Sequence, residues 1–405
     1  MKISKQILLG CFLLALACVS AAAAESSRAG MDMRKLQEIP KRMQEFVADG
    51  TISGAVTLVA RHSQVVSLEA VGLADIAHQK PMRTDDLFWI ASMTKPITSL
   101  AVLMLQDEGR LSVEDAVEKH LPEFKSQWMI EEKSDQALKL KRPPRPVTLR
   151  DLLTHTSGLG DVSAPRPDCS LAELVMAYSQ QPLRFPPGSK WEYSNAGINT
   201  LGRIVEVASG QKYEDFLRRR IFSPLGMRDT TFWPGAGQLK RLAKSYKPAQ
   251  NGRGLEETEI SFIKGGLSDH RRTPFPAGGL FSTARDLSCF YQMMLDGGTF
   301  KGQRLLSPAA VEQMTRPQTG DIRTGFVDGM SFGFGFAVVK TPAGVTAMLS
   351  PGTFGHGGAY ATQSWADPQK DLILVLMIQR AGFPNGDNSP VRRAFQEAAV
   401  AAILE

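Results

Sequence analysis

The stretch Ser92-Met93-Thr94-Lys95 begins a predicted helix that is apolar on nearly every face and ends at Gly109. Pro96 has no backbone N–H and fits only the first turn of a helix, which places Ser92 at or near the helix N-terminus. Residues three apart share a helix face, so the Lys95 amine can lie beside the Ser92 hydroxyl, as an activated serine nucleophile requires. A helix that is apolar all round belongs inside a large core.

The S-x-x-K pattern is weak on its own, because a serine-rich chain of 405 residues should contain about one copy by chance. A second copy does occur, at Ser261-Phe262-Ile263-Lys264. It precedes Gly265-Gly266 in a polar, charged stretch and begins no apolar helix. The second copy therefore illustrates a chance occurrence of the pattern, against which the helix context of the first copy can be compared.

The composition is that of a globular protein, since 43% of the residues are hydrophobic and can bury a substantial core. The formal net charge of +6 is small for this length and argues against a nucleic-acid partner. The six histidines show no paired spacing such as H-E-x-x-H, so no metal site is expected. There is also no G-x-S-x-G elbow and no Walker loop, which argues against an α/β-hydrolase and a nucleotide enzyme, and no cofactor is expected.

The first 24 residues have the layout of a secretory signal peptide: Lys2 and Lys5, an apolar run over residues 7–19, and small residues up to a cleavage site after Ala24. The run is too short to span a bilayer, so the mature chain is expected to lack a transmembrane segment. These features predict a periplasmic or secreted protein. Lipoprotein attachment through Cys18 is an alternative that rests on an indifferent lipobox.

Two further features leave alternatives open. Cys169 and Cys289 would remain after cleavage; they could pair in an oxidising compartment, but distant cysteines are more typical of small buried hydrophobic residues. Residues 133–150 are basic and rich in proline. They favour a solvated, proline-stiffened loop over a surface that binds an anionic ligand.

Strands are expected at both ends of the chain and helices in the middle. The expected strands are residues 55–60, 65–71, 332–339, 359–365 and 372–379. Short turns between strands imply antiparallel pairing. The expected fold is α/β (α+β), with an antiparallel sheet flanked by helices and an inserted all-helical region. Residues 25–405 would form a single domain, with its sheet in about 30–90 and 330–405 and its helices in about 91–330.

Two other short motifs contain residue types that can take part in catalysis. Tyr193-Ser194-Asn195 contains the only Y-x-N among six tyrosines, and His356-Gly357-Gly358 the only H-x-G among six histidines. Each alone could be structural, Tyr193 as a loop aromatic and His356 as part of a turn. His155, in a threonine-rich helix end, is more typical of a structural hydrogen-bonding residue than of a catalytic one.

With these motifs the chain resembles the serine hydrolases of the penicillin-binding type, which include class C β-lactamases, D-alanyl-D-alanine peptidases and related carboxylesterases. The resemblance covers nearly all of residues 30–400. It rests on the three motifs, supported by Leu152-Leu153-Thr154-His155-Thr156-Ser157-Gly158-Leu159, Trp191-Glu192 and Pro276-Ala277-Gly278-Gly279-Leu280-Phe281-Ser282-Thr283. It implies a β-lactamase/transpeptidase-like fold.

The resemblance also implies catalytic roles. Ser92 would attack an acyl carbon, and Lys95 and the Tyr193 phenol are the candidate bases. A cationic lysine beside the phenol would lower the pKa of Tyr193 and let it act near neutral pH. The backbone N–H groups of Ser92 and Ala359 would hold the oxyanion, with Ala359 on a strand after the third motif.

The substrate-binding residues implied by the resemblance are Asn195, on the acyl side, and His356, Gly357 and Gly358, on the opposite wall and strand edge. β-Lactamases usually carry Lys-Thr-Gly at the third motif, whose cation and hydroxyl meet the carboxylate of the drug. A mostly neutral histidine and a glycine should recognise a carboxylate weakly.

Small esters are therefore the expected substrates, hydrolysed through an acyl-Ser92 intermediate. A D-alanyl-D-alanine carboxypeptidase or amidase acting on an acyl-peptide is the alternative, and a class C-like β-lactamase comes third. A non-catalytic binding protein on the same fold would require the loss of Ser92, Lys95 or Tyr193, and all three are present.

Overall fold

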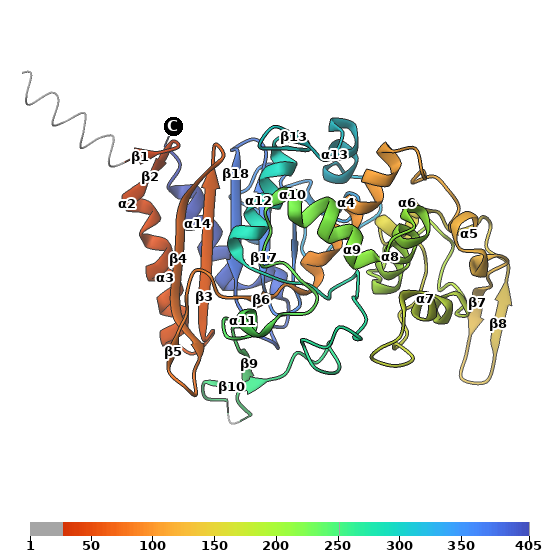
Figure 1. Ribbon diagram of the computed structural model, residues 1–405, viewed down its shortest axis with the longest axis horizontal. Helices are drawn as coiled ribbons and strands as arrows, with labels where there is room; N and C mark the ends of the chain where they lie inside the picture. Colours follow the sequence, from red (N-terminus) through yellow and green to blue (C-terminus); the bar gives the residue numbers. More distant parts are fainter. Residues whose placement is uncertain (1–26, 251, 405) are drawn as a thin grey trace, which may run out of the picture.

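The computed structural model of the protein describes residues 27–250 and 252–404, so the predicted signal peptide and Cys18 lie outside the described residues. Eight strands form one antiparallel sheet (Figure 1). In spatial order they are β14 (Met330–Phe332), β15 (Ala337–Val339), β16 (Phe354–Gly357), β17 (Gln363–Asp367), β18 (Leu372–Met377), β3 (Gly54–Arg61), β4 (Gln64–Asp75) and β5 (Lys80–Pro81).

The two ends of the chain meet where β18 pairs with β3, as the sequence predicts. Leu374 lies opposite Val59 in this pair, and β3 continues into β4 through a tight turn at Arg61 and Gln64. Helices α3 (Glu38–Ala48) and α14 (Pro390–Ala401) pack on one face of the sheet, over a hydrophobic cluster that includes residues of β3 and β18. Segments near both ends of the described chain therefore contribute to one core, which confirms the predicted fold class.

Beyond β5 the chain forms mainly helices. They are α4 (Thr94–Asp107), α5 (Val117–His120), α6 (Leu149–Leu153), α7 (Leu171–Ser179), α8 (Asn195–Ser209), α9 (Tyr213–Leu217), α10 (Ser223–Leu225), α11 (Ala236–Leu239), α12 (Ala284–Leu295) and α13 (Pro308–Thr315). Residues 94–105 of α4 are all buried, and α4 lies between the sheet and helices α6–α8 (Figure 1). The all-round apolar sequence of this helix thus places it in the core.

Three predicted elements differ from the observed ones. Residues 332–339 form no continuous strand, because β14 and β15 are joined by a turn in which Gly335 has φ +80°. The predicted strand 359–365 begins only at Gln363, and β16, which carries His356, was not predicted. The middle region is not all-helical, since β7 (Met129–Lys133) pairs with β8 (Leu138–Lys141).

Side-chain caps begin several helices. The Thr148 hydroxyl accepts the Asp151 backbone N–H at the start of α6, and Thr283 and Ser389 cap α12 and α14 in the same way.

Cys169 and Cys289 are free thiols. Within residues 27–250 and 252–404, none of the helices is both long enough and apolar enough to span a membrane.

Candidate active site

Ser92 lies in a strained turn between a short strand and the buried helix. Strand β6 (Phe88–Trp89) pairs with β11 (Phe281–Ser282) and leads into the 3₁₀ turn η1 (Ala91–Met93), which is followed by α4. Ala91 has φ +46°, a left-handed conformation that is uncommon for a residue with a side chain. The Thr94 hydroxyl donates to the Ala91 carbonyl at 2.7 Å and holds this turn. Ser92 is half-buried, so a substrate can reach its hydroxyl.

Lys95 is fully buried and lies directly beside Ser92. Its Nζ donates to Ser92 Oγ at 3.0 Å, to Asn195 Oδ1 at 2.9 Å and to the Ala277 carbonyl at 2.6 Å. Burial lowers the pKa of Lys95 to about 7, although the charge of Asp161 acts in the opposite direction. A neutral amine has two N–H bonds, which Asn195 and Ala277 can accept. Its lone pair is then left for the Ser92 hydroxyl.

The Tyr193 phenol is hydrogen-bonded to the Ser92 side chain, and its ring centroid lies 4.7 Å from Lys95 Nζ. Desolvation of the phenol raises the pKa of Tyr193 above its ordinary value. The expectation that Lys95 would lower this pKa is therefore wrong. Burial disfavours both charges, so the lysine loses its proton near neutral pH and the tyrosine keeps its own. Lys95 is the stronger candidate base, and Tyr193 is a hydrogen-bond donor.

Asn195 connects Lys95 to a carboxylate that the sequence did not reveal. The Asn195 Nδ2 amide donates to Asp161 Oδ2 at 3.0 Å, and the Ala196 backbone N–H donates to Asp161 Oδ1 at 2.6 Å. Asp161 thus lies at the N-terminus of α8, where a negative charge is favourable. It lies in a loop outside every motif, so only the fold brings it to Lys95.

His356 lies on the opposite wall, as the resemblance implied. It is 4% exposed, and its ring centroid is 6.1 Å from that of Tyr193. Its Nδ1 donates to the Gly357 carbonyl at 2.7 Å, which leaves Nε2 as the acceptor. Burial, assisted by the charge of Lys95, lowers the pKa of His356 to about 4. His356 is therefore neutral at pH 7.

Ala359 lies in a turn and not on the expected strand, because β16 ends at Gly357. The Gly358 N–H donates to the Thr362 carbonyl at 2.7 Å and closes this turn. β16 packs against η1, and a Cβ on Gly358 would lie 2.7 Å from the Ile90 carbonyl oxygen. Only glycine allows this approach, which brings the turn of Ala359 next to Ser92. Within the described part of the chain the Ala359 backbone N–H has no acceptor.

His155 supports the site structurally. Its Nδ1 accepts the Ser194 backbone N–H at 3.2 Å, and its ring lies 4.5 Å from that of Tyr193. Burial holds the pKa of His155 well below its ordinary value, so the ring is a neutral acceptor. This agrees with the structural role expected from the sequence.

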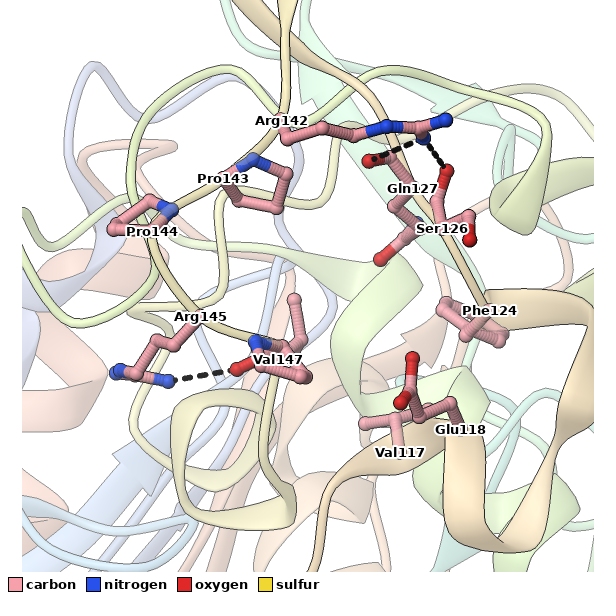
Figure 2. A pocket seen from close by; sticks show the side chains of 11 residues that line it. Val117, Glu118, Phe124, Ser126, Gln127, Arg142, Pro143, Pro144, Arg145 and Val147 are labelled. Carbon is pink, nitrogen blue, oxygen red and sulfur yellow. Dashed lines mark hydrogen bonds between the residues drawn. The ribbon is translucent and has the colours of Figure 1, made fainter.

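Within the described chain, two other sequence features contribute no side-chain hydrogen bond to these residues. Ser261 of the second S-x-x-K copy is exposed in a loop. The basic segment borders a hollow of about 240 Å³, in which the Arg142 guanidinium donates to the carbonyls of Ser126 and Gln127 (Figure 2). Arg145 is paired with Asp151. Of these two guanidiniums, Arg145 is neutralised by a carboxylate, whereas Arg142 is bonded to neutral carbonyls.

Comparison with known proteins gives the same family as the motifs. The Beta-lactamase family model matches residues 39–399. Esterase EstB of Burkholderia gladioli is 31% identical over 376 residues, which cover 86% of this chain and 91% of EstB. A protein of Escherichia coli K12, provisionally named a D-alanyl-D-alanine carboxypeptidase, is 28% identical over 95% of this chain and 92% of its own.

A solved structure supports the fold. EstCE1, described as a hydrolase with promiscuous acyltransferase activity, superposes with a TM-score of 0.74 at 24% sequence identity. The superposition covers 92% of this chain and 99% of EstCE1. The family model and EstB each extend over most of the sequence, and the superposition shows a shared fold. The chain therefore belongs to the beta-lactamase family.

Proposed function

We propose that this protein is a serine hydrolase that hydrolyses small esters through an acyl-Ser92 intermediate. The environment of Lys95 is the observation that carries the proposal. A lysine with a pKa of about 7 is largely neutral at slightly alkaline pH, and Ser92 Oγ lies 3.0 Å from its Nζ. General bases work best when their pKa lies near the working pH.

In the first half-reaction, Ser92 Oγ bonds to the acyl carbon while its proton passes to Lys95 Nζ. The Ser92 and Ala359 N–H groups stabilise the oxyanion of the tetrahedral intermediate. The bond between the acyl carbon and the alcohol oxygen then breaks, and Tyr193 relays the proton from Lys95 to the departing alcohol. In the second half-reaction, water attacks the acyl carbon, its proton returns through Lys95 to Ser92 Oγ, and the acid leaves.

The third motif supports esters over substrates that carry a carboxylate. His356 is neutral at pH 7 and Gly357 has no hydroxyl, so neither offers the charge or donor that Lys-Thr-Gly offers. A neutral ester needs no such contact. The relatives that are named as esterases are consistent with this assignment. The substrates of EstB itself are not assigned to this chain.

A D-alanyl-D-alanine carboxypeptidase is the second candidate, since the Tyr193-Ser194-Asn195 motif is complete and the Escherichia coli relative carries that provisional name. A β-lactamase ranks third. Release of D-alanine from a short muropeptide faster than ester hydrolysis would favour the peptidase, and rapid turnover of nitrocefin would favour the β-lactamase.

The test is hydrolysis of p-nitrophenyl acetate and butyrate by the purified protein and by Ser92→Ala. We expect hydrolysis only by the wild type, and an acyl adduct on Ser92 by intact-mass spectrometry under rapid acid quench. Ser261→Ala is the matched control and should retain full activity, because the second S-x-x-K copy is exposed in a loop. Equal rates for wild type and Ser92→Ala would refute the proposal.

We further propose that the protein is exported and acts in the periplasm or outside the cell. Support comes from the charge and apolar pattern of residues 1–24 alone. The mass of the protein from a bacterial host tests this: a mature N-terminus at Glu25 is expected. A lipid-modified N-terminal cysteine at position 18 would instead favour membrane anchoring.

A further inference from the structure

Asp387 occupies the space in which the third motif of a β-lactamase would carry its threonine. Asp387 lies in η5 (Gly386–Asn388), just before α14. A Cβ added to Gly357 would overlap Asp387 Oδ1 and lie 3.0 Å from Asp387 Cγ and 2.6 Å from Gln363 Nε2. These contacts exclude any side chain at position 357 while Asp387 keeps its place. The lack of a side chain at position 357 and the position of the Asp387 carboxylate therefore depend on each other.

A chain of hydrogen bonds fixes the carboxylate in this position. The Trp365 indole N–H donates to Gln363 Oε1 at 2.9 Å, so the other end of the Gln363 amide must be the donor. That Nε2 donates to Asp387 Oδ1 at 2.9 Å. The Asp387 backbone N–H donates to Asn385 Oδ1 at 3.0 Å. Asp387 is held as an acceptor by groups that cannot neutralise its charge.

No cation within the described residues forms an ion pair with the Asp387 carboxylate. Arg392 is near, but its Nη1 donates to the Asp387 backbone carbonyl, and its guanidinium stacks on Trp365. Arg392 is 1% exposed and its Nη2 is a buried atom, whereas Asp387 is half-buried. Both residues line the hollow beside His356, and the Asp387 carboxylate is the more exposed of the two charged groups.

The carboxylate also lies close to the reacting groups. Asp387, Gly357 and His356 line the same small hollow, with Phe326 and Phe332 on its apolar side. The charge of Asp387 raises the pKa of both His356 and Tyr193, against the direction of burial for His356. Its field therefore extends to the centre where the ester bond would be broken.

We propose that Asp387 determines the charge specificity of this site, by repelling substrates with a carboxylate on the leaving group and favouring neutral or cationic ones. This rests on the proposed ester hydrolysis. In a D-alanine peptide the carboxylate belongs to the leaving group, and Asp387 replaces the threonine hydroxyl that would bind it. The residue thus converts a carboxylate-binding position into a carboxylate-excluding one.

The experiment compares kcat/KM for three acetate esters: phenyl acetate, 3-acetoxybenzoate and (3-acetoxyphenyl)trimethylammonium. Their leaving groups carry no charge, a negative charge and a positive charge on the same ring. The wild type should hydrolyse the anionic ester about tenfold less efficiently than the neutral one, after correction for the different leaving-group pKa by the rates in hydroxide. The cationic ester should be at least as good as the neutral one.

Asp387→Asn removes the charge and keeps an oxygen for Gln363, so the anionic-to-neutral ratio of kcat/KM should rise about tenfold; the ratio is the readout because both esters share any change in the catalytic groups. Asp387→Ser is a second variant in case the first is unstable. Asp371→Asn, an exposed carboxylate paired with His62 at the turn between β17 and β18, is the matched control and should leave the ratio unchanged.

The outcomes separate this inference from the proposed function. Hydrolysis of no ester by the wild type would refute the ester hydrolase itself. Hydrolysis with equal corrected efficiency for anionic and neutral esters, or the same ratio in a folded Asp387→Asn or Asp387→Ser, would refute the role of Asp387 alone. A wild-type preference for the anion would also overturn it and indicate Arg392 instead.

Discussion

Asp161→Asn should shift the pH dependence of the enzyme to lower pH. The proposed base is neutral Lys95, so kcat/KM should rise with pH through the lysine pKa of about 7. The Asp161 carboxylate raises that pKa because it favours the ammonium. Without the Asp161 charge, less opposes the lowering of the Lys95 pKa by burial. The pKa of Lys95 should therefore fall further. Asp161 acts through Asn195 and is therefore a positioning residue rather than a catalytic one.

The size of the shift follows from the hydrogen bonds. Lys95 Nζ to Asn195 Oδ1 is 2.9 Å and Asn195 Nδ2 to Asp161 Oδ2 is 3.0 Å. Two such bonds in series place the charges roughly 7 Å apart. At an effective dielectric constant of about 40, chosen because Asp161 is exposed, their attraction is about 1.2 kcal/mol, or about one pKa unit. At pH 6 the variant should reach about half of its own plateau, against roughly a tenth for the wild type.

The assay is the pH profile of kcat/KM for phenyl acetate between pH 5 and 9, at constant ionic strength. The plateau of Asp161→Asn should also fall, because asparagine replaces one of the two oxygens that accept from the Ala196 N–H and the Asn195 amide by an NH2 group, which cannot accept. The position of the acidic limb is independent of that loss. Asp168→Asn, whose carboxylate is 54% exposed and paired with Arg166, is the control. An unchanged or raised apparent pKa in Asp161→Asn would refute the reasoning.

Three further changes test the site and its support. Ser92→Ala should lower kcat for esters at least about 10³-fold and leave the far-UV circular dichroism unchanged; retention of more than a tenth of the activity would exclude Ser92 as nucleophile. Tyr193→Phe should lower kcat about 10²–10⁴-fold with a smaller change in KM, because only the proton relay is lost, and a change confined to KM would argue against a relay. Gly335→Ala should destabilise the protein by about 1–3 kcal/mol in urea unfolding, since φ is +80° and the new Cβ would overlap Ser99 Oγ. Gly237→Ala, a helical glycine with open space at its Cβ, should be neutral or stabilising, and an equal loss in both variants would contradict this account.

The local features of the fold were predictable because their causes are local. An all-apolar run after Pro96 has only the interior in which to pack, and α4 is buried there. The hydroxyl of Thr148 caps α6 in the same local way, through a bond between residues three apart. By contrast, β16 was missed because Gly355, Gly357 and Gly358 weaken its strand pattern. Its pairing with β15 and β17 stabilises it instead.

The sequence by itself determined the family and the proximity of Ser92, the proposed nucleophile, to Lys95, because residues three apart on a helix must be neighbours. The tertiary structure decided the protonation states of Lys95 and Tyr193 and the residues that line the proposed substrate site. Of the two candidate bases, burial favours Lys95 over Tyr193, since desolvation lowers the pKa of the lysine and raises the pKa of the phenol. Asp161 and Asp387 reach the site from distant loops, 66 and 295 positions along the chain from Lys95 and Ser92 respectively. Only chain folding brings such residues together, because no local spacing rule connects them.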